Sequence, residues 1–185
     1  MTARPTRRAA LAAALSTAAL AACAPAAPPQ VGPDGRPLPK LYRISSREAP
    51  RVPLRALDAV NALRAGNGVA ALALDPRLSA AAATHSRDMS LQNRPWHFGS
   101  DGSSPVDRAR RAGFTGRLLG EAISETYESE LETVAAWMQE PGPRRVLMDP
   151  EARLMGFAFH QDADGKLWWT LNTGTASGTA PGAAA

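Results

Sequence analysis

The sequence predicts an α+β domain with a small antiparallel sheet, and three observations lead to this class. Amphipathic helical patterns come first along the chain, and alternating apolar segments joined by a tight turn come last. Helices that precede strands, instead of alternating regularly with them, are typical of α+β architectures. The patterned part of the chain covers roughly 120 residues, which suits one domain with one hydrophobic core.

Two helices open the patterned region. Residues 54–65 carry apolar side chains at the spacing of an amphipathic helix, and Gly66 follows as a stop signal. After a short apolar connector, Asp75 and Pro76 begin a second helix, because proline suits the first helical position. We expect this helix to run to Gln92.

A third helix should begin at Ser104 and Pro105 and stop at Gly113. A strand is expected within residues 118–127. Residues 129–139 have helical spacing of apolar side chains, and acidic residues in their first turn favour a helix N-terminus there.

The last part of the domain has the pattern of a β-hairpin. Residues 141–143 read Pro-Gly-Pro and are expected to break the chain. Residues 153–160 and 166–172 are two expected strands, and the Asp-Ala-Asp-Gly sequence at 162–165 supplies the turn between them.

The first 22 residues have the parts of an export signal. Arg4, Arg7 and Arg8 make a positive start without acidic residues, and residues 9–22 form an apolar run rich in alanine and leucine. A bilayer-spanning helix takes about 20 apolar residues, so this run is too short to be one. The paired arginines fit a loose twin-arginine signal, and the general secretory route is the alternative.

The apolar run ends Leu-Ala-Ala-Cys, which resembles the lipobox of bacterial lipoproteins. The resemblance implies that Cys23 is acylated and becomes the mature N-terminus. Cys23 is the only cysteine, so it cannot form an internal disulfide, and lipidation explains a lone thiol in an exported chain. The alternative is an ordinary signal peptide cleaved near an incidental cysteine. In a Gram-negative cell, Ala24 after the cysteine favours the outer membrane, facing the periplasm.

A linker follows Cys23 and a small-residue tail ends the chain. Residues 24–53 hold eight of the 16 prolines, which favours an extended spacer, and the tail is mainly Gly, Ala, Ser and Thr. The expected organisation is therefore a signal peptide at 1–22, a lipidated cysteine with a proline-rich linker at 23–53, a domain at 54–172 and a disordered tail at 173–185.

The formal net charge of +4 does not indicate a nucleic-acid partner. Three of the 21 basic residues lie in the signal, which leaves 18 basic and 17 acidic residues in the rest of the chain. The short cluster of Arg108, Arg110 and Arg111 is expected on a solvated helix face. We expect no nucleic acid, no cofactor and a monomer.

A series of motifs follows one order along the chain: Val-Asn-Ala-Leu-Arg at 60–64, Leu-Asp-Pro-Arg-Leu at 74–78, His-Ser-Arg-Asp-Met at 85–89, Trp-His-Phe at 96–98, Asp-Gly-Ser-Ser-Pro at 101–105, Arg-Ala-Gly-Phe at 111–114, Gly-Glu-Ala-Ile at 120–123, Trp-Met at 137–138, Gly-Phe-Ala-Phe at 156–159 and Trp-Trp-Thr at 168–170. Together they resemble the CAP superfamily, closest to its bacterial branch of extracellular SCP-like proteins. The family includes cysteine-rich secretory proteins, insect antigen 5 and plant pathogenesis-related class 1 proteins. The resemblance implies an α-β-α sandwich, with helices on both sides of a small antiparallel sheet.

The resemblance implies a cleft in which two histidines and two acidic residues gather, and two positions match. They are His97 and Glu121, an imidazole and a carboxylate that together can hold a metal or relay a proton. The second acid is replaced by Ala135, and the histidine of the bacterial Ser-Pro-Gly-His-Arg motif is replaced by Pro143. Zinc takes three or four protein ligands, so we expect no metal site. His85, on an apolar helix face, is expected to be structural, and a third ligand is the alternative.

Tryptophans offer a second kind of site. Trp168 and Trp169 are neighbours on an expected strand, so their side chains face opposite sides of the sheet. One should pack in the core, and the other would form an aromatic surface with Trp96 and Trp137 for sugar or lipid. The ligand-binding candidates are therefore Trp96, His97, Glu121 and Trp169.

Three functions are consistent with these features. The first is a non-enzymatic binding module at the cell envelope, anchored to the membrane through Cys23, for a glycan, lipid or protein. The second is a hydrolase of envelope material with Glu121 and His97 as acid and base. The third is a structural protein that packs against a partner. A fold does not fix a function, so the resemblance leaves all three open.

Overall fold

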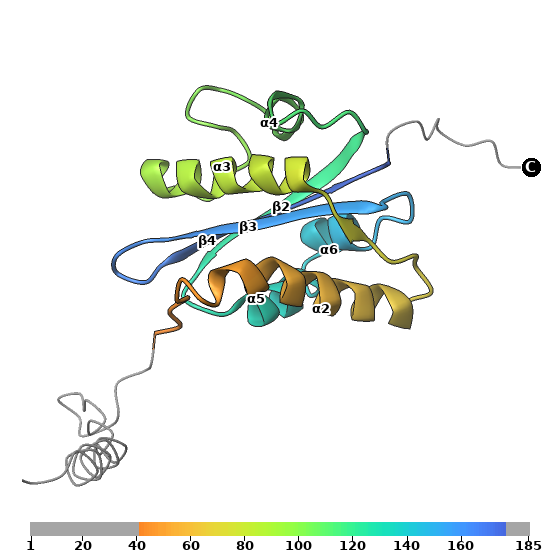
Figure 1. The fold of residues 1–185 in the computed structure, drawn as a ribbon, viewed down its shortest axis with the longest axis horizontal. Coiled ribbons are helices and arrows are strands. Elements are labelled where there is room, and N and C mark those ends of the chain that lie inside the picture. Colours follow the sequence, from red (N-terminus) through yellow and green to blue (C-terminus); the bar gives the residue numbers. More distant parts are fainter. Residues whose placement is uncertain (1–40, 177–185) are drawn as a thin grey trace, which may run out of the picture. The chain divides into compact units, whose positions relative to one another are not determined.

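The computed structural model describes residues 41–176, which form a three-layered domain. A four-stranded sheet lies between two layers of helices, as Figure 1 shows. Helices α3 (Pro76–Gln92) and α4 (Pro105–Arg111) cover one face. Helices α2 (Val52–Gly66), α5 (Glu130–Trp137) and α6 (Pro141–Leu147) lie on the other side, and the turn η1 (Ala49–Arg51) leads into α2. The expected α-β-α sandwich is confirmed.

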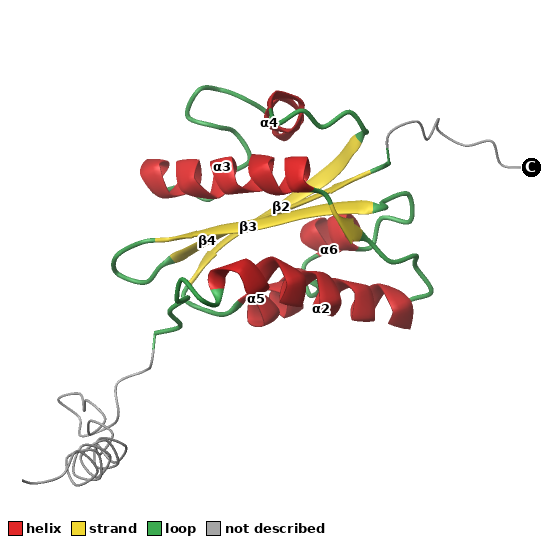
Figure 2. Ribbon diagram, viewed as in Figure 1, coloured by secondary structure: helices red, strands yellow, loops and turns green. Residues whose placement is uncertain are grey.

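The sheet has the order β1-β3-β4-β2, so β2 is an edge strand (Figure 2). Strands β3 (Leu154–Gln161) and β4 (Leu167–Gly174) form the expected antiparallel hairpin, and β2 (Leu118–Thr126) pairs antiparallel with β4. The two-residue strand β1 (Ala73–Leu74) pairs parallel with β3. The expectation of an antiparallel sheet is wrong at this strand. The connector between α2 and α3 runs beside β3 in the same direction as β3, so the two strands pair in parallel.

Side-chain caps explain where three of the helices begin. The Asp75 carboxylate accepts hydrogen bonds from the backbone N–H groups of Arg77 and Leu78, at 2.8 and 3.0 Å. Ser104 and Ser129 each form a capping box with the acidic residue three positions later, at the starts of α4 and α5. These caps satisfy N–H groups that the first helical turn leaves without partners. The helix starts predicted from these residues agree with the structure within one residue.

Residues 141–143 do not break the chain as expected, since helix α6 begins at Pro141. A proline in the first turn of a helix loses no hydrogen bond, because the N–H groups there have no acceptor within the helix. Figure 1 shows α6 beside β2, so this helix helps to shape the surroundings of the edge strand.

The structured domain extends beyond the expected limits of 54 and 172. Tyr42 donates a hydrogen bond from its hydroxyl to the buried Glu130 carboxylate at 2.8 Å, and its carbonyl accepts one from the Gln161 side chain at 2.8 Å. At the other end, β4 continues to Gly174, and the Thr175 N–H donates to the Arg117 carbonyl at 2.9 Å. The proposed signal peptide, Cys23 and most of the linker and tail lie outside the described residues.

The two faces of the sheet differ in character. The face toward α2 and α5 carries the main apolar core, which includes Trp137, Phe157 and Trp169. The face toward α3 is polar close to β2: Ser86 of α3 donates a hydrogen bond to the Thr170 hydroxyl at 2.9 Å, and Asn172 lies in register with Glu121. Within residues 41–176, no helix combines the length and the apolar character that crossing a membrane requires.

Candidate functional site

Glu121 is the centre of the candidate site. It lies on β2 directly opposite Asn172 of β4, whose side-chain amide donates to the Leu78 carbonyl of α3 at 3.5 Å. Directly paired residues point to the same face of a sheet, so the Glu121 side chain also points toward the α3 layer. Only 2% of that side chain is exposed. A carboxylate this deeply buried requires hydrogen-bonding or charged partners.

The main partner of Glu121 is Arg108, from the middle of α4. One guanidinium nitrogen of Arg108 contacts both carboxylate oxygens, at 2.9 and 2.8 Å. The guanidinium also donates to the backbone carbonyls of Ser103 and His97, at 2.9 and 3.0 Å. The expectation that Arg108 lies on a solvated face is wrong, because α4 turns Arg108 and Ala109 inward while Arg110 and Arg111 remain exposed. A buried carboxylate on a strand needs a cationic partner, and this requirement is the signal that could have identified Arg108 from the sequence.

His97 lies on the loop between α3 and α4, with its imidazole beside Glu121. The His97 Nδ1 atom is 2.9 Å from the Glu121 carboxylate, and 51% of the His97 side chain is exposed. The structure therefore brings together the two residues carried over from the family motif. The Arg108 contact with the His97 carbonyl fixes the loop, so α4 positions both members of the pair.

His85 lies beneath this pair and is fully buried in α3. Its Nε2 atom is 2.9 Å from the Trp96 carbonyl and 3.6 Å from the Glu121 carboxylate. Because a carbonyl oxygen can only accept, Nε2 carries the proton, and Nδ1 has no hydrogen-bond partner among the described residues. Burial lowers the pKa of His85, with the Glu121 charge acting in the opposite direction. His85 is therefore a neutral, packed histidine that supports the loop.

These residues do not form a metal-ligand set. No three His, Cys, Asp or Glu side chains within residues 41–176 are grouped as a metal ion needs. At Glu121, the Arg108 guanidinium contacts both carboxylate oxygens, the atoms that a cation would require. Ala135 is exposed on α5, and Pro143 faces the site without a ligand atom in its side chain.

The aromatic candidates divide into one surface residue and buried ones. Trp96 is partly exposed, with the Arg94 guanidinium stacked 3.8 Å from its ring centroid and Phe98 5.6 Å away. The expectation that Trp169 contributes to an aromatic surface is wrong, because its side chain is buried. Both sheet faces are covered by helices, so Trp168 and Trp169 are buried on opposite faces. Trp137 is also buried and cannot form that surface.

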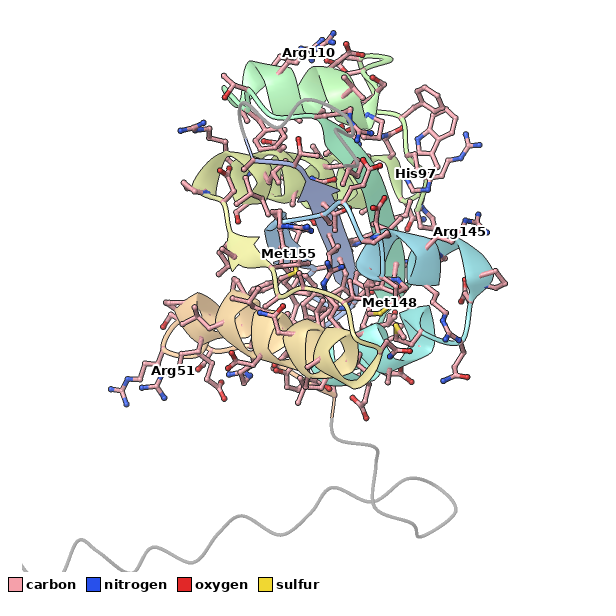
Figure 3. The ribbon with its side chains drawn as sticks, turned by 90° about the vertical axis from the view of Figure 1, so that its right-hand side faces the viewer. Arg51, His97, Arg110, Arg145, Met148 and Met155 are labelled. Carbon is pink, nitrogen blue, oxygen red and sulfur yellow. The ribbon has the colours of Figure 1, made fainter. Side chains whose placement is uncertain are left out.

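Two hollows meet at His97 and Glu121 and follow the outer edge of β2. One, of about 340 Å³, is lined by β2 residues 118–121 together with Val106 and Val146. The other, of about 470 Å³, is lined by β2 residues 121–123 together with Trp96 and Pro143. We call them together the β2 groove. In Figure 3, His97 and the α6 residue Arg145 lie on the same side of the domain.

Comparison with known proteins supports the family resemblance. A model of the CAP family, described as the cysteine-rich secretory protein family, matches residues 57–173. An uncharacterized protein of Bacillus subtilis, YkwD, is 28% identical over 114 residues, covering 62% of this chain and 44% of that protein. The chain thus spans less than half the length of this curated relative.

Two solved structures share the fold. One is an extracellular protein of Bacillus anthracis that contains an SCP domain, with a TM-score of 0.63, 20% identity, and coverage of 72% of this chain and 45% of that chain. The other is an outer surface protein of Borrelia burgdorferi, with a TM-score of 0.63, 16% identity, and coverage of 74% of this chain and 98% of that chain. With its three-layered fold and the family match over most of the domain, this chain belongs to the CAP family of cysteine-rich secretory proteins.

Proposed function

We propose that this chain is a non-enzymatic binding module of the cell envelope, which uses the β2 groove to hold a glycan, lipid or protein of that envelope. One observation carries the proposal. The Glu121 carboxylate is buried and contacted by Arg108 and His97, which favours a role in holding the site together over contact with a substrate. Its neighbours hold the loop that forms one wall of the groove.

The N-terminal sequence supports the proposal that this module is anchored at a membrane surface. A signal that ends at Cys23, followed by a proline-rich spacer, suits a lipid-anchored protein whose domain stands off the membrane. The names of two structural relatives are consistent with this setting, since one is an extracellular protein and the other an outer surface protein. If the Cys23 anchor exists, a Cys23→Ser variant moves from the membrane fraction to the soluble fraction. Unchanged membrane association would contradict the anchor.

A specific observation favours hydrolysis as a second candidate function. The His97 imidazole is half-exposed in the groove, and its Nδ1 atom is held by a carboxylate, as in catalytic His-acid pairs. Glu121 itself has no free carboxylate oxygen to offer a substrate, because Arg108 contacts both oxygens and only 2% of the side chain is exposed. In a hydrolytic mechanism, His97 would therefore act as the base that activates a water molecule.

The binding function is tested with the purified full-length chain and an isolated envelope fraction. We expect the protein to sediment with the envelopes, and a Trp96→Ala variant to lose most of that binding because Trp96 lines the groove. The matched control is Tyr127→Ala, which removes another exposed aromatic residue that does not line either hollow. Equal binding by wild type and Trp96→Ala would contradict a role for the groove.

A further inference from the structure

A buried histidine helps to hold the loop between α3 and α4, which forms one wall of the β2 groove. His85 has no exposed surface, and its Nε2 atom donates a hydrogen bond to the Trp96 carbonyl at 2.9 Å. Trp96 and His97 both line the groove. The Trp96 indole also donates to Gln92 at 3.1 Å, and Arg108 donates to the His97 carbonyl at 3.0 Å. The position of this wall therefore depends in part on the hydrogen bond from His85.

The His85 ring cannot take up a second proton cheaply while the loop is closed. Its Nδ1 atom is buried and has no hydrogen-bond partner among the described residues. A second proton would place an N–H donor and a positive charge there, and a buried donor or charge without a partner is costly. Histidine ordinarily gains this proton between pH 8 and pH 5. The closed loop therefore requires the neutral form of His85, and acid opposes closure.

Two carboxylates act on His85, and both are engaged elsewhere. Glu121 of β2 lies 3.6 Å from Nε2, but Arg108 of α4 contacts both of its oxygens. Asp88 lies one turn further along α3 and accepts two hydrogen bonds from Ser100 of the loop. The Arg108 guanidinium also repels a charged imidazole. Burial outweighs the attraction of the carboxylates and lowers the pKa of His85.

The other histidines near His85 do not account for loosening in acid. Strand β4 carries no titratable side chain, and the one on β3, His160, lies beside Asp162 near the hairpin turn. On the loop, His97 lies on the other side of the Glu121 carboxylate. A proton added to His97 would place a positive charge beside that carboxylate and strengthen their contact. Protonation of His97 would hold the loop more firmly, so loosening in acid would point to His85.

We propose that His85 makes the β2 groove sensitive to acid: the ring takes up a second proton, the loop lifts from α3, and the groove loses the wall that holds its ligand. This inference rests on the proposed binding function and adds its regulation. Closure of the loop is most stable above the ordinary histidine pKa of about 6.5. Below it, the open fraction rises by up to about tenfold for each pH unit, because only the open form gains the proton.

Amide hydrogen exchange of the full-length ¹⁵N-labelled chain measures this opening without a ligand. In the loop, the Gly99 N–H donates to a backbone carbonyl and the Ser100 N–H to a carboxylate of α3. Their protection factors, which correct for the intrinsic effect of pH, should fall at least about tenfold from pH 7 to pH 5. The matched controls are Val69 and Leu72 in the connector after α2, which donate to a backbone carbonyl and a side chain. Equal changes in loop and connector, or no change in the loop, would overturn the inference.

A His85→Gln variant removes the titration but keeps a side-chain N–H for the Trp96 carbonyl. Its loop protection factors should differ by less than about twofold between the two pH values. The matched control is His160→Gln, because His160 lines neither hollow of the groove, and it should behave as the wild type does. Loss of loop protection in acid that persists in His85→Gln would assign the effect to another group and overturn the inference.

A measurement on the wild type decides the matter if His85→Gln does not fold. Ring ¹⁵N spectra of the closed form should show His85 with a single proton, on Nε2, at both pH 7 and pH 5. A doubly protonated His85 ring in a loop that remains protected would overturn the inference.

Binding to isolated envelopes connects the opening to the proposed function. The wild type should bind at least several-fold more weakly at pH 5 than at pH 7, and His85→Gln should bind equally at both. If acid weakens both proteins to the same extent, the inference fails while the proposed function stands. If the wild type does not bind envelopes even at pH 7, the proposed function fails, and hydrogen exchange still decides whether His85 opens the loop.

Discussion

Removal of the Arg108 guanidinium should cost more stability than any surface substitution on α4. An Arg108→Met change leaves the Glu121 carboxylate buried with His97 as its remaining close partner. It also removes the Arg108 hydrogen bond to the His97 carbonyl and one of the two hydrogen bonds to the Ser103 carbonyl, which keeps the Gly99 N–H as a donor. Only 5% of the Arg108 side chain is exposed, so solvent screens the pair weakly. Breaking a buried ion pair from one side costs about 3–5 kcal/mol. For a domain of this size, we expect a decrease in Tm of roughly 10–20 °C.

Urea denaturation followed by tryptophan fluorescence measures this loss. The matched control is Arg110→Met, an exposed arginine on the same helix, for which we expect a change within about 0.5 kcal/mol. The double variant Arg108→Met with Glu121→Gln should recover about 2 kcal/mol relative to Arg108→Met, because no buried charge is left alone. A loss below about 1 kcal/mol for Arg108→Met, or no recovery in the double variant, would refute this reasoning.

Three other features of the domain have testable consequences. A Cβ atom on Gly156 would lie 2.1 Å from the Leu78 carbonyl carbon, so Gly156→Ala should force α3 away from β3. We expect the free energy of unfolding, measured by urea denaturation, to fall by about 1–3 kcal/mol or more. An unchanged free energy of unfolding would contradict this close packing. Burial lowers the pKa of His85, so the unfolded chain binds more protons and stability should fall as the pH decreases through the unfolded-state pKa of about 6.5. A His85→Gln variant should show a flatter pH dependence of the urea midpoint, and an equal slope would show that another group is responsible. Burial and the neighbouring Glu130 carboxylate raise the pKa of Tyr42 to about 12. Ultraviolet titration should therefore show one tyrosine that ionises near this pH, and Tyr42→Phe should remove that step. If the step persists in Tyr42→Phe, it belongs to another residue.

Much of the fold could be predicted from local signals in the sequence. The caps at Asp75, Ser104 and Ser129 act within one turn, so residue type and spacing alone locate the starts of their helices. Helix α6 was missed because prolines stop a helix in its interior but are tolerated in its first turn. The parallel pairing of β1 with β3 depends on residues about 80 positions apart, which no local pattern indicates.

The candidate site could be predicted only in part. The family motif pointed to His97 and Glu121, which the structure places 2.9 Å apart. Arg108 was missed because three nearby arginines on a short helix have the same residue type, and only packing against β2 distinguishes the buried one. Trp169 was misplaced because strand alternation was used alone: it predicts opposite faces for Trp168 and Trp169, and in the expected α-β-α sandwich helices cover both of those faces.

Incubation of the full-length chain with isolated envelopes, with analysis of the supernatant by mass spectrometry, tests the central claim most directly. Because Glu121 is engaged by Arg108 and His97, we expect the protein to be retained on the envelopes while no new soluble fragments of envelope material form. Envelope fragments released by the wild type, and not by a His97→Ala variant of equal stability, would contradict the account and show that this groove catalyses hydrolysis.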